Sequence, residues 1–133
     1  MKSDDQLMTE LRAAAEGLLF MSETDHPLEV VRWESARQIT REFLTRDAGK
    51  AADAPVEEAT AAQVFRAATS EPEWKGEEEL TTARRFQALV RLLEENLDEL
   101  TAYRVGEIDI TVYVVGRSPG GDWLGVRTRA VET

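Results

Sequence analysis

The chain has 133 residues, a length typical of one domain; 42% of the residues are hydrophobic and 32% are charged. This balance is typical of a folded globular protein and excludes general disorder, which would need fewer apolar residues at this charge. Acidic residues outnumber basic ones by 26 to 16, for a net charge of −10. Such a charge disfavours direct nucleic-acid binding and favours a basic protein partner, although it would also serve solubility alone.

Cysteine is absent from the sequence, which excludes disulfides and thiolate metal sites. No basic start followed by an apolar stretch is found, and no run reaches the ~18 apolar residues of a membrane helix. We therefore expect a cytoplasmic protein that has no membrane partner, needs no cofactor and is monomeric when free.

The first predicted element is a helix that begins after Ser3. Ser3 and Gln6 have the spacing of a capping box, in which each side chain bonds to the backbone of the other residue. Gly17 is expected to end this helix. Apolar side chains recur at helical spacing and predict a buried face made of Leu7, Met8, Leu11, Ala14, Ala15 and Leu18.

A carboxylate-rich segment directly follows an apolar run. Residues 18–21 read Leu-Leu-Phe-Met, and residues 22–27 read Ser-Glu-Thr-Asp-His-Pro. The apolar run is expected to anchor in the core, while the acids must stay in water or meet a cation. The sequence therefore predicts an acidic loop on a rigid base.

The middle of the chain alternates short elements with loops. Residues 28–33 have the composition of a strand, and Ile39, Phe43 and Leu44 indicate a short helix or an irregular segment. Residues 47–55 are rich in alanine, aspartate and glycine, have no clear period and are expected to form a loop.

Two further helices are predicted next. Thr60 and Gln63 repeat the capping-box spacing at the start of a short helix that ends near Thr69. A loop over residues 70–76 follows, and apolar residues spaced by three or four then predict a long helix over about residues 77–100.

The C-terminal third is typical of a β-hairpin. Apolar and polar residues alternate from Ile108 to Val115, residues 118–122 form a turn rich in glycine, and residues 123–131 return as the partner strand. The successive valines at 114 and 115 indicate that both faces of the sheet are covered. Helices followed by a hairpin predict an α+β fold.

The residues needed for an enzyme are few. His26 is the only histidine, and it lacks an evident nucleophile and orienting acid. No phosphate-binding glycine motif is present. We expect no enzymatic activity; the remaining alternatives are a small hydrolase that uses carboxylates and an oxygen-ligand ion site at Glu23, Asp25 and Glu29.

Three segments together resemble the nuclease A inhibitor family: residues 18–27, residues 103–107 (Tyr-Arg-Val-Gly-Glu) and residues 130–133 (Ala-Val-Glu-Thr). Proteins of that family bind and block sugar-non-specific, metal-dependent nucleases. The resemblance spans nearly the whole chain and is weakest between residues 35 and 62. It implies a single domain over residues 1–133 and a three-layer α/β/α sandwich around a mainly antiparallel sheet.

The resemblance also implies the residues that contact the partner. Glu23 matches the family acid that enters the nuclease active site, and Thr133 matches the terminal threonine whose hydroxyl reaches the nuclease metal. Glu73 and Trp74 match an acid–tryptophan pair that makes a second contact. The inhibitor would thus act as a phosphate mimic with no metal ion of its own, Glu23 and Thr133 reaching the ion of the partner.

The chain differs from the family pattern at two positions. Glu73 replaces a shorter aspartate, which moves its oxygens outward by about one methylene, and His26 replaces a tyrosine. An alternative function is a general protein–protein interaction module that uses the same scaffold for a different basic partner. The sequence does not name the target nuclease.

Overall fold

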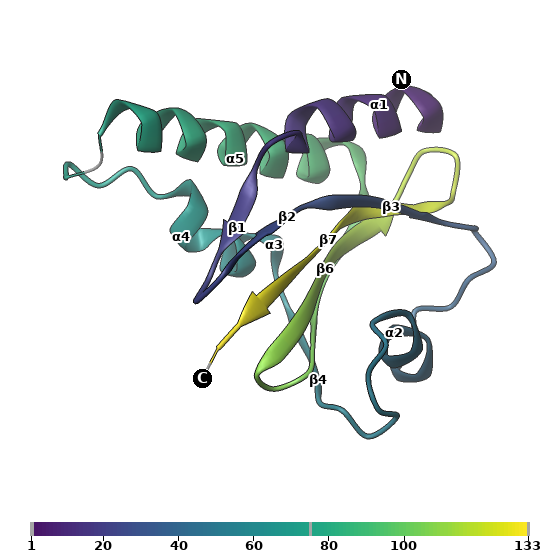
Figure 1. Ribbon diagram of the computed structural model, residues 1–133. Helices are drawn as coiled ribbons and strands as arrows, with labels where there is room; N and C mark the ends of the chain where they lie inside the picture. Colours follow the sequence, from purple (N-terminus) through teal and green to yellow (C-terminus); the bar gives the residue numbers. More distant parts are fainter. Residues whose placement is uncertain (1, 75, 133) are drawn as a thin grey trace.

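The computed structural model describes residues 2–74 and 76–132, so Met1, Lys75 and Thr133 lie outside it (Figure 1). Its helices are α1 (Asp4–Ala15), α2 (Arg41–Asp47), α3 (Ala61–Val64), α4 (Arg66–Thr69) and α5 (Glu77–Asn96). Its strands are β1 (Leu19–Met21), β2 (Asp25–Pro27), β3 (Glu29–Trp33), β4 (Val56–Ala59), β5 (Asp98–Val105), β6 (Asp109–Arg117) and β7 (Trp123–Val131).

A five-stranded antiparallel sheet forms the centre of the molecule, with the strand order β3-β7-β6-β5-β4. The predicted C-terminal hairpin is confirmed as β6 and β7, which pair from Asp109 opposite Val131 to Arg117 opposite Trp123. A separate two-stranded sheet joins β1 and β2, with Phe20 opposite His26. Helices and strands are thus mixed, and the predicted α+β class is confirmed.

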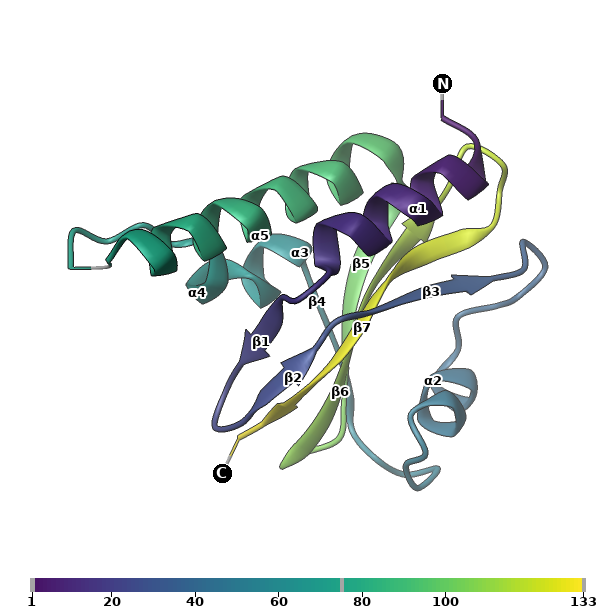
Figure 2. The same ribbon diagram turned by 45° about the horizontal axis from the view of Figure 1, so that its top comes forward.

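The two faces of the larger sheet are covered differently. Figures 1 and 2 show α1 and α5 side by side over one face, and α2 on the opposite side of the sheet. Val112 and Val114 of β6 belong to the main core with α1 and α5, whereas Tyr113 belongs to a smaller cluster with Leu44 of α2. Burial of both Val114 and Val115 confirms that the central strand is covered on both faces.

The start of the chain folds as its capping residues predict. Ser3 caps α1, and both hydrogen bonds of the capping box with Gln6 are present. Leu7 and Leu11 are fully buried in the main core. Gly17 follows the helix with φ of +73°, a left-handed conformation that glycine adopts without steric cost.

A buried polar contact fixes α2 to the sheet. The hydroxyl of Tyr113 donates to Asp47 Oδ2 at 2.6 Å, and Arg127 donates to the same oxygen at 3.0 Å. Burial, reinforced by the hydrogen bond to Asp47, raises the pKa of Tyr113 above its ordinary value. Asp47 lies at the end of α2, so this contact joins the helix to two strands.

The predicted long helix ends earlier than expected, at Asn96 rather than near residue 100. Leu97 has an extended backbone, and Asp98 begins β5, a strand that was not predicted. The residue spacing continues to favour a helix here, but pairing with β6 prevails. The pairing register shifts between Asp98 and Thr101, where Glu99 has φ of +54°.

Residues 56–69 also differ from prediction. Strand β4 gives no signal in the sequence, because its four residues, with two adjacent glutamates, do not alternate between apolar and polar. The Thr60 capping box is confirmed, but the single predicted helix is two short helices that meet at Phe65. Phe65 is fully buried beside Phe20 and Phe86, which accounts for the change of direction at this point.

Candidate functional site

The acidic loop between β1 and β2 is attached to the last residues of β7. The backbone N–H of Val131 donates to Ser22 Oγ at 2.9 Å, and the N–H of Glu23 donates to the carbonyl of Val131 at 3.3 Å. Within the loop, both the N–H and the hydroxyl of Ser22 donate to the carbonyl of Thr24 at 3.0 Å. The bonds to Val131 therefore place Glu23, whose side chain is exposed, beside the end of β7. Figures 1 and 2 show the turn between β1 and β2 next to this end of β7.

The end of β7 is also held from its other side. The N–H of Glu132 donates to the carbonyl of Ile108 at 3.0 Å, and the carboxylate of Glu132 pairs with Arg104. The chain is thus positioned up to residue 132. Thr133 lies outside the described residues, and its predicted role stays a prediction.

Strand β1 forms the base of the acidic loop. Phe20 is buried at 8% exposure, whereas Leu19 and Met21 are 45% and 74% exposed. The prediction that the whole run 18–21 anchors in the core was therefore wrong for Leu19 and Met21. The reason is the two-residue period of a strand, which sends alternate side chains to opposite faces.

His26 helps to shape the loop from β2. Its ring nitrogen Nδ1 and the hydroxyl of Thr24 form a hydrogen bond of 3.1 Å, and its backbone lies opposite Phe20. The side chain of His26 is half-buried, and the residue lies in β2. Position 26, where the family has tyrosine, thus still supports the turn that carries Glu23.

The loop that carries Glu73 and Trp74 is attached to α5 by side chains. Arg84 Nε donates to Glu71 Oε1 at 3.3 Å, and Gln87 Nε2 donates to Glu71 Oε2 at 2.6 Å. Trp74 is 78% exposed, the highest value among the large apolar residues that the structure describes as exposed. Glu73 is exposed as well.

An apolar groove connects this tryptophan to the base of the acidic loop. Trp74 lines a hollow of about 520 Å³ together with Leu19 and Met21, and buried Ala83 and Phe86 of α5 line it from below. We call this hollow the Trp74 groove. The structure thus brings Trp74 next to β1, the strand that precedes the acidic loop with Glu23, while neither Glu23 nor Glu73 lines the groove itself.

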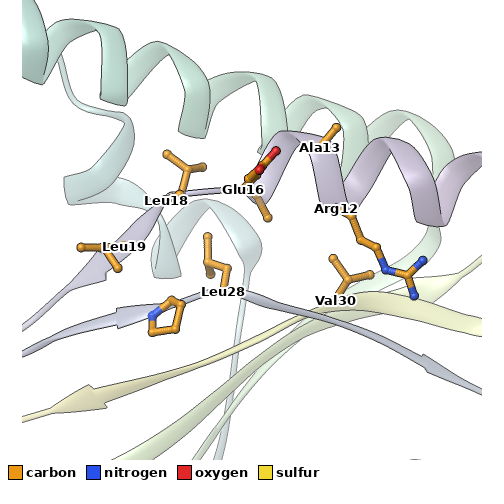
Figure 3. A pocket seen from close by; sticks show the side chains of 10 residues that line it. Arg12, Ala13, Glu16, Leu18, Leu19, Leu28 and Val30 are labelled. Atoms are coloured by element: carbon orange, nitrogen blue, oxygen red, sulfur yellow. The ribbon is translucent and has the colours of Figure 1, made fainter.

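A second hollow lies between α1 and the strands that follow it. Its volume is about 550 Å³, and Figure 3 shows Arg12 and Glu16 on the helix side, opposite Leu28 and Val30. Of the predicted site residues that the structure describes, Glu23, Glu73 and Trp74, none lines this hollow. Glu16, one of the lining residues, accepts at its carbonyl a hydrogen bond of 2.6 Å from Arg85 of α5.

Basic side chains near the end of β7 are engaged by carboxylates. Arg129 pairs with Asp109 at 2.9 Å, and Lys50 reaches the same carboxylate at 3.1 Å. The hydrogen bond from Arg129, followed by that from Lys50, lowers the pKa of Asp109. Arg127 pairs instead with Glu29, at 3.0 Å, and with Asp47.

The described ranges, 2–74 and 76–132, contain no group of three or more histidine, aspartate or glutamate side chains that could hold a metal ion. Glu23, Asp25 and Glu29 are thus not brought together as such a group. In the same ranges, no helix combines the length and the apolar character that a membrane crossing requires.

These features define an acidic α+β binding protein that presents a fixed loop beside the end of its last strand. A family model described as nuclease A inhibitor-like protein matches residues 5–133, and the chain belongs to this family. A search of curated proteins finds no match. Membership implies, in general terms, a nuclease inhibitor that has a nuclease as its partner and is not itself an enzyme.

Proposed function

We propose that this protein inhibits a metal-dependent, sugar-non-specific DNA/RNA endonuclease by inserting its acidic loop and its C-terminus together into the active site. One observation carries this proposal: the two hydrogen bonds that join Ser22 and Glu23 to Val131. Because of them, the loop and the tail approach a partner as one fixed surface rather than as two mobile segments. A preformed surface loses less conformational freedom on binding.

The chemistry of such a nuclease makes the carboxylate of Glu23 a suitable substitute for substrate. A catalytic divalent ion prefers hard oxygen ligands and leaves positions open for the phosphate of the nucleic acid. A carboxylate supplies anionic oxygens but no phosphodiester bond that the enzyme can cleave. The hydroxyl of Thr133 would add a further oxygen near the same ion.

Glu73 and Trp74 would form a second contact outside the active site. The high exposure of Trp74 supports this assignment, since an indole left in water is an unusual use of a large apolar side chain. Tryptophan is enriched among the residues whose truncation costs about 2 kcal/mol or more at interfaces. The longer side chain of Glu73, compared with aspartate, would adjust this contact to the particular nuclease.

The net charge of −10 supports the proposal through long-range attraction. A nuclease that binds nucleic acid presents a basic cleft, and an acidic inhibitor is drawn toward it as the substrate is. Association should therefore slow as salt is added, because screening acts mainly on the encounter.

The test is a titration of the host's own metal-dependent nuclease with this protein. We expect cleavage to be lost at equimolar, micromolar concentrations, and we expect Glu23→Gln and Trp74→Ala each to raise the dissociation constant at least tenfold, about 1.4 kcal/mol. Deletion of Thr133 should weaken inhibition as well. Undiminished cleavage at an equimolar dose would count against the proposal, and unaltered binding by both variants would favour an interaction module with another basic partner.

Several related predictions remain open. We propose that the scaffold is a three-layer α/β/α sandwich in one domain, α2 being its thin third layer, because Leu44 packs against Tyr113 and Val105. Monomeric behaviour, cytoplasmic location and activity without a cofactor also stay predictions.

A further inference from the structure

The Trp74 groove is an unusual concentration of exposed apolar surface. Four large apolar side chains are exposed in the described ranges, and Leu19, Met21 and Trp74, three of the four, line this groove. Pairing between β1 and β2 does not require apolar side chains at positions 19 and 21, because both point outward from the core. Apolar side chains gathered around one hollow indicate a surface that another molecule covers.

The charges at the groove restrict what that molecule can be. Among the residues that the structure describes (2–74 and 76–132), the charged side chains that line it are Glu78 and Glu79 in the first turn of α5, and none is lysine or arginine. A wholly apolar occupant would leave two carboxylates without partners, whereas a lone cation would be buried against apolar walls at high cost. An apolar side chain flanked by lysine or arginine satisfies both requirements.

The position of the groove connects it with the acidic loop. Met21 lines the groove, and the next two residues, Ser22 and Glu23, form the hydrogen bonds to Val131 that fix the loop. A partner that receives Glu23 in its active site therefore extends its neighbouring surface over the groove. No movement of the backbone is needed, since the floor is formed by buried residues of α5.

We propose that the Trp74 groove receives an apolar side chain of the inhibited nuclease, carried on a segment whose flanking lysine or arginine side chains meet Glu78 and Glu79. This inference rests on the proposed function and adds to it the part of the nuclease surface that determines specificity. The contact of Glu23 with the active site would be common to metal-dependent nucleases. The groove would select among these nucleases through the shape and the flanking charges of the nuclease segment that it receives.

The experiment measures inhibition of the same nuclease by variants that change the groove at exposed positions. Ala67→Trp fills the hollow, Met21→Ser removes an apolar wall, and Glu78→Lys with Glu79→Lys reverses its charge; all these residues are exposed. We expect each of the first two variants to raise the inhibition constant at least fivefold and the charge reversal to raise it at least tenfold.

Matched controls use positions away from the groove. Glu94→Lys with Glu95→Lys makes the same change of charge near the other end of α5, and Ala62→Trp adds an indole at an exposed alanine that does not line the hollow. Both controls should stay within threefold of the original protein. Circular dichroism and thermal unfolding would establish that every variant is folded.

The outcomes separate this inference from the proposed function. If Glu23→Gln weakens inhibition while the three groove variants stay within twofold of the original protein, the groove is not a contact and the inference is overturned. If the unaltered protein inhibits no cleavage at all, the proposed function fails and the inference fails with it. Weaker inhibition by the groove variants, with unchanged controls, supports both.

Discussion

The two loops expected to contact a nuclease are held in different ways. The Glu23 loop is joined to β7 by two hydrogen bonds of the Val131 backbone, one from the N–H of Glu23 and one to the side-chain oxygen of Ser22, so its position follows from the sheet. The Trp74 loop is attached to α5 through the side chain of Glu71, which bonds to Arg84 and Gln87 at the surface. A loop fixed by the sheet is suited to a contact that must be exact, while a loop fixed by exposed side chains can adjust to different partners.

The largest effect is expected when both contacts are removed together. Glu23→Gln combined with Trp74→Ala should raise the inhibition constant about hundredfold, which corresponds to twice the free energy lost in a tenfold change. The two free energies should add because the two loops have separate attachments. A double-mutant cycle measured by inhibition assays gives this value. A combined loss close to that of one variant alone would indicate a single coupled contact and would remove the distinction between the loops.

A smaller effect is expected from Ser22→Ala. This change removes the oxygen that accepts from the N–H of Val131 and should weaken inhibition about fivefold, corresponding to about 1 kcal/mol. Hydrogen exchange should become faster at the amides of Glu23 and Val131. Thr81→Ala is the control, because that hydroxyl bonds only to Glu77 within α5 in the described ranges. Unaltered exchange at both amides would show that the sheet does not fix the loop.

Glu71→Ala should weaken inhibition only about two- to threefold, since its ion pair with Arg84 is exposed and such pairs contribute less than about 1 kcal/mol. The loss should disappear when Trp74 is already alanine, because Glu71 acts by positioning that loop. Glu94→Ala removes the same charge from a distant part of α5 and serves as the control. An equal loss in both Trp74 backgrounds would contradict the assigned role.

The smallest effect on inhibition is expected at the opposite face of the sheet. Tyr113→Phe should leave inhibition within twofold but lower the free energy of unfolding by about 1 kcal/mol, because a buried hydroxyl bonded to Asp47 is lost. Calorimetry and the inhibition assay measure the two quantities. A large loss of inhibition would extend the contact surface to α2.

The same variant has a defined pH dependence. Burial raises the pKa of folded Tyr113 above 10.0, its ordinary value, so the folded protein keeps a proton that the unfolded chain releases. The contribution of protonated Tyr113 to the free energy of unfolding is therefore complete below pH 10 and declines as the pH rises above that value. Tyr113→Phe should reduce this decline, and Tyr103→Phe, at a half-buried position whose pKa is raised by burial and by Glu58, should reduce it less.

Part of the site was predictable because its signals are local. The loop at residues 70–76, the acidic loop after the apolar run and the attachment of the chain end to a strand all follow from nearby residues. The exposure of Met21 was predictable in principle, since the alternation of a strand separates it from Phe20. The alternation is hard to see in the sequence because residues 18–21 are all apolar.

The sequence by itself determined the elements whose signals lie within a few residues: the Ser3 and Thr60 capping boxes, the end of α1 just before Gly17, and the alternation that forms β6 and β7. Local hydrogen bonding and side-chain period are sufficient there. Only the tertiary structure decided that the chain turns into β5 at Leu97, that Glu23 bonds to Val131 across 108 positions, and that Trp74 and Met21 share one groove. These outcomes depend on pairing and packing between segments that are distant in the sequence. The free energy of such contacts depends on residues that become neighbours only in the folded protein, and not on the residues adjacent in the sequence.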